Sequence, residues 1–91
     1  MSLTAASIPV LRRGVRRQFD AARNGPILMA PERVVMLDEI ADAIIGECIA
    51  GGSVHLIAAN LAARFAAPAD QVEEDVLSFV QDLIDKGLMT I

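Results

Sequence analysis

The sequence predicts an α+β fold in which a three-stranded antiparallel sheet is followed by three helices. Two observations predict it. Up to Leu37 the apolar residues alternate with polar ones or form runs of four, whereas after Asp38 they recur every three to four residues. Turn-forming residues separate these segments. The 91 residues fit one small domain, and with 54% hydrophobic residues that domain can build a core.

Three short segments have the character of strands. In the first, Val15 and Phe19 stand between polar neighbours. The pair Asn24-Gly25 then predicts a hairpin turn, because both residues tolerate positive φ. The next two segments are apolar runs on either side of a second turn. The predicted strands cover residues 14–20, 27–30 and 34–37.

Each predicted helix begins at a polar residue that can cap it. Asp38 and Ser53 can accept the free N–H groups of a first turn, and Asp70 with Glu73 can form a reciprocal capping box. Gly87 is expected to end the last helix in the left-handed conformation. The stop signals of the first two helices are Gly51-Gly52 and Ala67-Pro68. The short turn between these helices is typical of a winged helix-turn-helix.

The chain is expected to hold one domain and no membrane segment. Residues 1–11 show no periodicity and are expected to form a flexible tail, so that residues 12–91 make up the folded domain. No apolar run approaches the roughly 20 residues that span a bilayer, and the N-terminus lacks the charged leader of a signal peptide. We therefore expect a cytoplasmic protein without a membrane partner.

Few groups in the sequence are suited to catalysis. Cys48 and His55 are its only cysteine and histidine, which excludes an intrachain disulfide and a CxxC motif. Cys48 lies on an apolar helix stripe, where a free cysteine packs as a small hydrophobe. A zinc site needs three or four ligands, which this pair cannot supply. We expect no enzymatic activity, no metal and no cofactor.

The net charge of −4 is unevenly distributed. Residues 1–33 carry six arginines against Asp20 and Glu32, a net charge of +4, and the remainder carries −8. The helix predicted over residues 70–86 has six acidic residues and Lys86, a net charge of −5. In a DNA-binding helix-turn-helix this helix would approach the phosphates and be repelled by them. A winged-helix DNA-binding regulator is therefore only the alternative function, with a structural or carrier module as a third.

The predicted strand at residues 34–37 favours another kind of partner. At the edge of the sheet its outward N–H and C=O groups could pair with a second extended chain, and a neighbouring helix could supply side-chain pockets. Alternatively, strand and helix only build the core. The residues by themselves leave these two interpretations open.

A long spaced pattern resembles a known family. It consists of residues 28–38, Ile40-Ala41, Ile44, Gly51-Gly52, Leu61-Ala62, Asp75-Val76, Phe79, Leu83 and Gly87-Leu88. Over about residues 10–90 the chain is similar to the D protein of pyrroloquinoline quinone (PQQ) biosynthesis, a stand-alone recognition element for ribosomally made precursor peptides. The resemblance implies a winged helix-turn-helix that binds a precursor peptide and not nucleic acid.

The resemblance also implies a site and partners. The peptide would add antiparallel to the third strand and lie against the third helix. It would be presented to a radical S-adenosylmethionine (SAM) enzyme, which crosslinks a Glu and a Tyr of the precursor. The chain could also form a homodimer by edge pairing or swapping. What the arginine-rich N-terminal part binds stays an open question. The implied peptide-binding residues are Glu32, Arg33, Val34, Val35, Met36, Leu37, Val76, Phe79, Val80 and Leu83.

We expect no binding to duplex DNA, even at about 50 mM salt, where attraction to phosphate is strong. The reason is the charge of the third helix, which raises the free energy of any approach to a polyanion. A mobility-shift titration measures this binding. A saturable, salt-sensitive shift at micromolar protein would favour the DNA-binding alternative.

Overall fold

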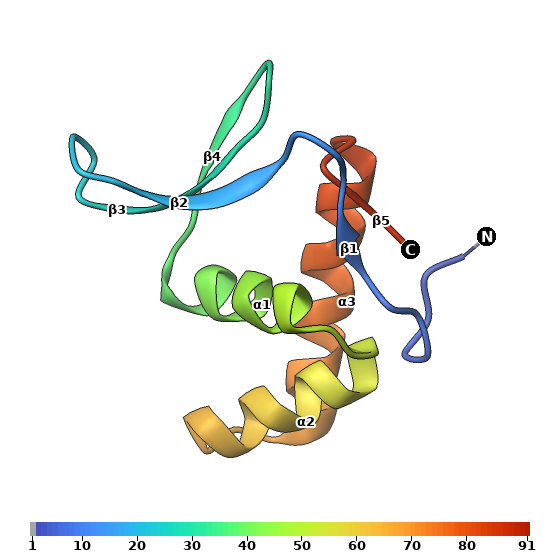
Figure 1. Ribbon diagram of the computed structural model, residues 1–91. Coiled ribbons are helices and arrows are strands. Elements are labelled where there is room, and N and C mark those ends of the chain that lie inside the picture. The colour runs from blue at the N-terminus through green and yellow to red at the C-terminus, as the bar shows by residue number, and fades with distance from the viewer. Residues whose placement is uncertain (1) are drawn as a thin grey trace.

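The computed structural model describes residues 2–91 and confirms the predicted α+β fold (Figure 1). Three antiparallel strands form a sheet in the order β2-β3-β4, which in Figure 1 lies above α1 and α2 and to the left of the C-terminal end of α3. From Ser2 onward, no helix is both long enough and apolar enough to cross a membrane. The main elements are β2 (Arg16–Asp20), β3 (Gly25–Met29), β4 (Val34–Met36), α1 (Glu39–Ala50), α2 (Val54–Phe65) and α3 (Ala69–Asp85).

A second, two-stranded sheet joins the two ends of the described chain. β1 (Val10–Leu11) pairs antiparallel with β5 (Met89–Thr90), and Pro9, which precedes β1, is fully buried. The structure thus differs from the predicted flexible tail over residues 1–11, of which Met1 lies outside the described residues. Strands of two residues are too short to create a periodicity, and each has its partner at the opposite end of the chain.

The segment before β1 also caps a helix. The carbonyl oxygens of Ser7 and Ala5 accept hydrogen bonds from the backbone N–H groups of Val54 and His55, both at 2.9 Å. These N–H groups belong to the first turn of α2, where the helix itself offers no acceptor. The N-terminal segment therefore satisfies donors that would otherwise need water.

Two of the predicted helix caps are confirmed. The Asp38 carboxylate accepts the Ala41 N–H at 2.8 Å, and the Ser53 hydroxyl oxygen accepts the Leu56 N–H at 3.2 Å. Both cap residues have extended backbones, as the first non-helical residue requires.

The predicted Asp70–Glu73 capping box is wrong. α3 begins at Ala69, directly after Pro68, and no side chain caps it. Pro68 has the fixed φ of proline, −62°, and a helix can start immediately behind it. Asp70 therefore lies inside the first turn, where its charge still complements the helix dipole. Glu73 instead contacts His55, with 2.8 Å between Oε1 and Nδ1.

The hairpin between β2 and β3 has a longer loop than Asn24-Gly25 alone predicts. Asp20 pairs with Gly25, so the loop is residues 21–24, and only Asn24 has positive φ, +54°. The Asp20 carboxylate accepts the N–H of Ala22 at 3.0 Å and also binds the Arg23 guanidinium. This local side-chain capping favours the four-residue loop.

The core connects the sheet to all three helices. Leu28 and Leu37 are buried in one apolar cluster with the stripes of the helices. Arg17 forms a two-fold hydrogen-bonded ion pair with Asp42 of α1, at 2.7 and 2.9 Å. Because Arg17, Leu28 and Val35 are cross-strand neighbours, their side chains share one face, which we call the helix-facing side of the sheet. The opposite face is called the outer side.

α3 ends in a Schellman motif, which confirms the prediction for Gly87. Gly87 has a φ of +75° and its N–H donates to the carbonyl oxygen of Ile84, while the Leu88 N–H donates to that of Leu83, both at 2.9 Å. Leu88 is 4% exposed. The motif therefore returns the chain to the core and leads it into β5.

Gly87→Ala is expected to lower the free energy of unfolding by about 1–2 kcal/mol, because a Cβ disfavours positive φ. Crowding is not the reason, since nothing lies within 4 Å of the position a Cβ would take. Gly25→Ala is the matched control, because Gly25 has no positive φ and its nearest neighbouring atom would be at 4.0 Å. Urea denaturation measures both variants, and equal losses of stability would contradict the assignment.

Candidate functional site: the free edge of the sheet

β4 is paired on one side only. Its register with β3 places Val35 opposite Leu28, the Leu37 N–H donates to the Pro26 carbonyl at 3.0 Å, and the Arg33 carbonyl accepts the Ala30 N–H at 2.9 Å. In an antiparallel ladder, alternate residues direct their backbone groups to opposite sides. Val34 and Met36 therefore direct N–H and C=O away from β3. We call these outward groups the β4 edge.

The β4 edge has two different faces. Val34 and Met36 lie on the outer side and are 42% and 63% exposed. Val35 is partly buried and Leu37 is buried on the helix-facing side. A chain added along this edge would thus have solvent on one face and the helical layer on the other.

On α3, the structure separates the predicted site residues into two groups. Val76, Val80 and Leu83 expose no surface and belong to the core. Phe79 is only partly buried and packs on that core from its margin. Direct contact of the peptide with the three buried residues stays a prediction, and it would require the core to open. Phe79 is accessible without such a rearrangement.

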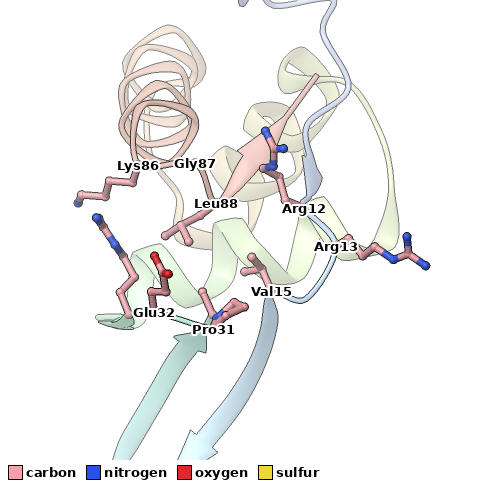
Figure 2. A pocket seen from close by; sticks show the side chains of 10 residues that line it. Arg12, Arg13, Val15, Pro31, Glu32, Lys86, Gly87 and Leu88 are labelled. Carbon is pink, nitrogen blue, oxygen red and sulfur yellow. The ribbon is translucent and has the colours of Figure 1, made fainter.

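A hollow of about 460 Å³ lies at the start of β4 (Figure 2). Three distant parts of the chain line it: the connection before β2, the turn between β3 and β4, and the end of α3. Figure 2 shows Lys86 and Leu88 above Pro31 and Glu32, while Arg13 points away from them. The lining residues are Arg12, Arg13, Val15, Ala30, Pro31, Glu32, Arg33, Lys86, Gly87 and Leu88.

This hollow is basic. In the part of the chain that the structure describes, Arg12, Arg13 and Arg33 have no carboxylate oxygen within 4.0 Å, whereas Lys86 contacts Asp82 at 2.7 Å. Glu32 is the single acid among the lining residues. Sequence reasoning placed Glu32 and Arg33 in the site but missed Arg12 and Lys86. The excess of arginine in the N-terminal part indicated a basic surface, but only the fold shows that this surface lies at the start of β4.

Two other arginines of the hairpin are already paired. Arg17 binds Asp42, and this hydrogen bond raises the pKa of Arg17 above its ordinary value. Arg23 binds Asp20, and the contact lowers the pKa of that carboxyl group. The N-terminal arginines therefore divide into structural ones and ones that are free to meet a partner.

Beyond the other end of β4 lies a second, smaller hollow of about 150 Å³ between the helices. Its walls are apolar apart from Asp75. Ile40, in the first turn of α1 and only four residues after Met36, lines this hollow and is 49% exposed. The lining residues are Ile40, Ile44, Leu61, Phe65, Ala67, Val72, Asp75 and Val76.

Cys48 and His55 lie away from both hollows. Cys48 is 6% exposed in the core, and this burial, followed by the neighbouring Glu47, raises the pKa of its thiol to about 11. The His55 side chain is 77% exposed beside Glu73. Within residues 2–91, no three His, Cys, Asp or Glu side chains are grouped as metal ligands would be.

A winged helix-turn-helix with an open strand edge beside its last helix defines the class of domains that can bind an extended peptide by strand addition. The family model described as coenzyme PQQ synthesis protein D (PqqD) matches residues 26–89. The chain belongs to this family.

Individual relatives agree with this assignment. A "PqqA binding protein" of Bradyrhizobium diazoefficiens is 40% identical over 90 residues, which cover 99% of this chain and 87% of the relative. The solution structure of the PqqD truncation of Methylobacterium extorquens PqqCD, described as a stand-alone recognition element, superposes with a TM-score of 0.86 at 32% identity, covering 99% and 96% of the two chains. A lasso peptide synthetase B1 complexed with its leader peptide has the same fold, with a TM-score of 0.80 at 18% identity and coverage of 93% and 100%.

Cys48 is expected to react slowly with a thiol reagent in the native protein. The thiolate is the reactive form, and with a pKa of about 11 only roughly one thiol in a thousand is ionised at pH 8. The rate should rise about tenfold per pH unit towards pH 11 and become ordinary in denaturant. Fast labelling of the folded protein at pH 8 would show that Cys48 is neither buried nor inert.

Proposed function

We propose that the chain is a peptide adaptor of PQQ biosynthesis that binds the PqqA precursor peptide by adding it as a strand to β4. The observation that carries the proposal is the β4 edge, where Val34 and Met36 offer two donors and two acceptors at strand spacing. Relatives named PqqA binding proteins support the choice of peptide. The acidic α3, by contrast, argues against a nucleic-acid partner.

We propose an antiparallel orientation for the added strand. The sheet is antiparallel throughout, and antiparallel pairing is slightly more stable per residue than parallel pairing. Alternate side chains of the peptide would then meet the helix-facing side, next to Val35, Leu37 and Phe79. The remaining peptide side chains would point to the outer side with Val34 and Met36.

The adaptor role includes a second partner, a radical SAM enzyme that crosslinks a Glu and a Tyr of the bound precursor. Because β-strand addition fixes the backbone of the bound segment, it would leave the rest of the peptide free to enter the enzyme. Reconstitution tests this: the chain should raise the yield of crosslinked peptide measured by mass spectrometry without forming any product alone. Equal yields with and without the chain would contradict the adaptor role.

A homodimer, by edge pairing or by swapping, would use the same free backbone groups. Peptide and second copy would then compete for the β4 edge. Light scattering of the protein with and without saturating peptide distinguishes them, because peptide should shift any dimer to monomer. A dimer that keeps its mass while binding peptide fully would show that it uses another surface.

Val34→Pro is expected to abolish peptide binding, because it removes an outward N–H and places a proline ring at the edge. Proline is tolerated on edge strands, so the fold should survive. Val34→Thr is the matched control, since it keeps the N–H and the branched side chain and should bind within about twofold of the parent. Calorimetric titration with the precursor peptide measures both affinities.

Circular dichroism and thermal melting serve as the check on folding. Met36→Pro is the second variant in case Val34→Pro does not fold. A folded proline variant at either position that binds with unchanged affinity would exclude strand addition at β4.

A further inference from the structure

We propose that the basic hollow at the start of β4 binds a carboxylate side chain of the peptide, three residues C-terminal to the peptide residue that lies opposite Met36. The inference rests on the strand addition proposed above. It adds a charge requirement at one position of the peptide, and with it a second argument for the antiparallel direction proposed above.

The register follows from antiparallel pairing. If a peptide residue lies opposite Met36, the second residue after it lies opposite Val34 and the third lies opposite Arg33. Residues directly opposite each other project to the same face of a sheet. Arg33 alternates with Val34 and so shares the helix-facing side with Val35. The third residue would therefore lie beside Arg33 on the side of the sheet where α3 ends.

The charges at this position favour an acid. Arg33 and Arg12 have no carboxylate partner among residues 2–91, and Lys86 lines the same hollow. Opposite charges on directly opposed strand residues attract, and like charges repel. A lysine or arginine of the peptide would thus be rejected here, and an aspartate or glutamate would be held.

The other end of β4 has the opposite character. The small hollow beside Ile40 is apolar, and its single charged lining residue is Asp75. A peptide bound in the reverse direction would bring its acidic residue toward Asp75 and leave Arg33 unpaired. The two ends of the edge therefore discriminate between the two directions of the bound chain.

The test uses the PqqA precursor peptide and variants in which each Asp or Glu is changed singly to the corresponding amide. One replacement should weaken binding about three- to tenfold at about 50 mM salt and much less at about 500 mM salt. The Arg33→Glu variant should bind the unchanged peptide more weakly by at least the same factor. A peptide with Arg at the sensitive position should bind Arg33→Glu better than it binds the parent protein.

Arg16→Glu is the matched control. It makes the same change of charge on an exposed arginine of β2 that has no ion-pair partner among residues 2–91, but Arg16 alternates with Arg17 and so lies on the outer side. It should change the affinity by less than about twofold at the same salt. A nitroxide at the C-terminal end of the peptide should broaden the amide signals of Arg33 and Lys86, and one at the N-terminal end those of Ile40 and Phe65.

Any one of three results would overturn the inference. One is that Arg33→Glu and Arg16→Glu weaken binding equally. Another is that no acidic residue of the peptide matters, and the third is that the nitroxide effects are reversed. If Val34→Pro still abolishes binding, strand addition stands and only the acid site fails. If Val34→Pro binds normally, the proposed function itself fails.

Discussion

The burial of one stripe of α3 is the contact on which the rest of the structure depends. Val76, Val80 and Leu83 expose no surface and share one cluster with Leu28 and Leu37 of the sheet. Burying side chains of this size contributes about 1.5–3 kcal/mol each before the entropy of ordering the chain is counted. The buried residues of α1 and α2, among them Ile45 and Ile57, belong to the same cluster. The stripe therefore fixes where the sheet sits, and with it the position of the β4 edge.

An open edge is a hazard as well as a binding surface, because any extended chain can pair with it. β4 limits this hazard by its length of three residues. Charged residues stand on both sides, with Glu32 and Arg33 before the strand and Asp38 and Glu39 after it. A partner must therefore match a short apolar window between charges. This constraint favours a particular peptide over self-association along a long edge.

The sequence predicts the features that depend on neighbours along the chain. Asp38, Ser53 and Gly87 act as expected, because caps and left-handed turns are local. It fails where the outcome depends on distant residues. The Asp70–Glu73 box is lost because Pro68, two residues before Asp70, is the N-cap of α3, and because Glu73 contacts His55 of another helix.

The candidate site shows the same division. The period that places Val76, Phe79, Val80 and Leu83 on one face cannot tell a core residue from one at its margin, since all four lie on a single stripe. The gathering of Arg12, Arg33 and Lys86 requires three chain segments that are remote in sequence. The alternation in β4 and the basic N-terminal part indicate from the sequence that a binding site exists. Only the three-dimensional packing determines which side chains belong to it.

The two-stranded sheet couples the chain ends to the site. Leu88 lines the basic hollow and its carbonyl accepts the Arg12 N–H at 3.0 Å, at the point where β1 meets β5. Fraying of this ladder would therefore also separate Arg12 from Lys86. Thermodynamic linkage is reciprocal, so a peptide held in the hollow would protect the N-terminal segment against proteolysis. By the same reasoning, removing the N-terminal segment would lower the affinity for the peptide even if the segment does not contact it.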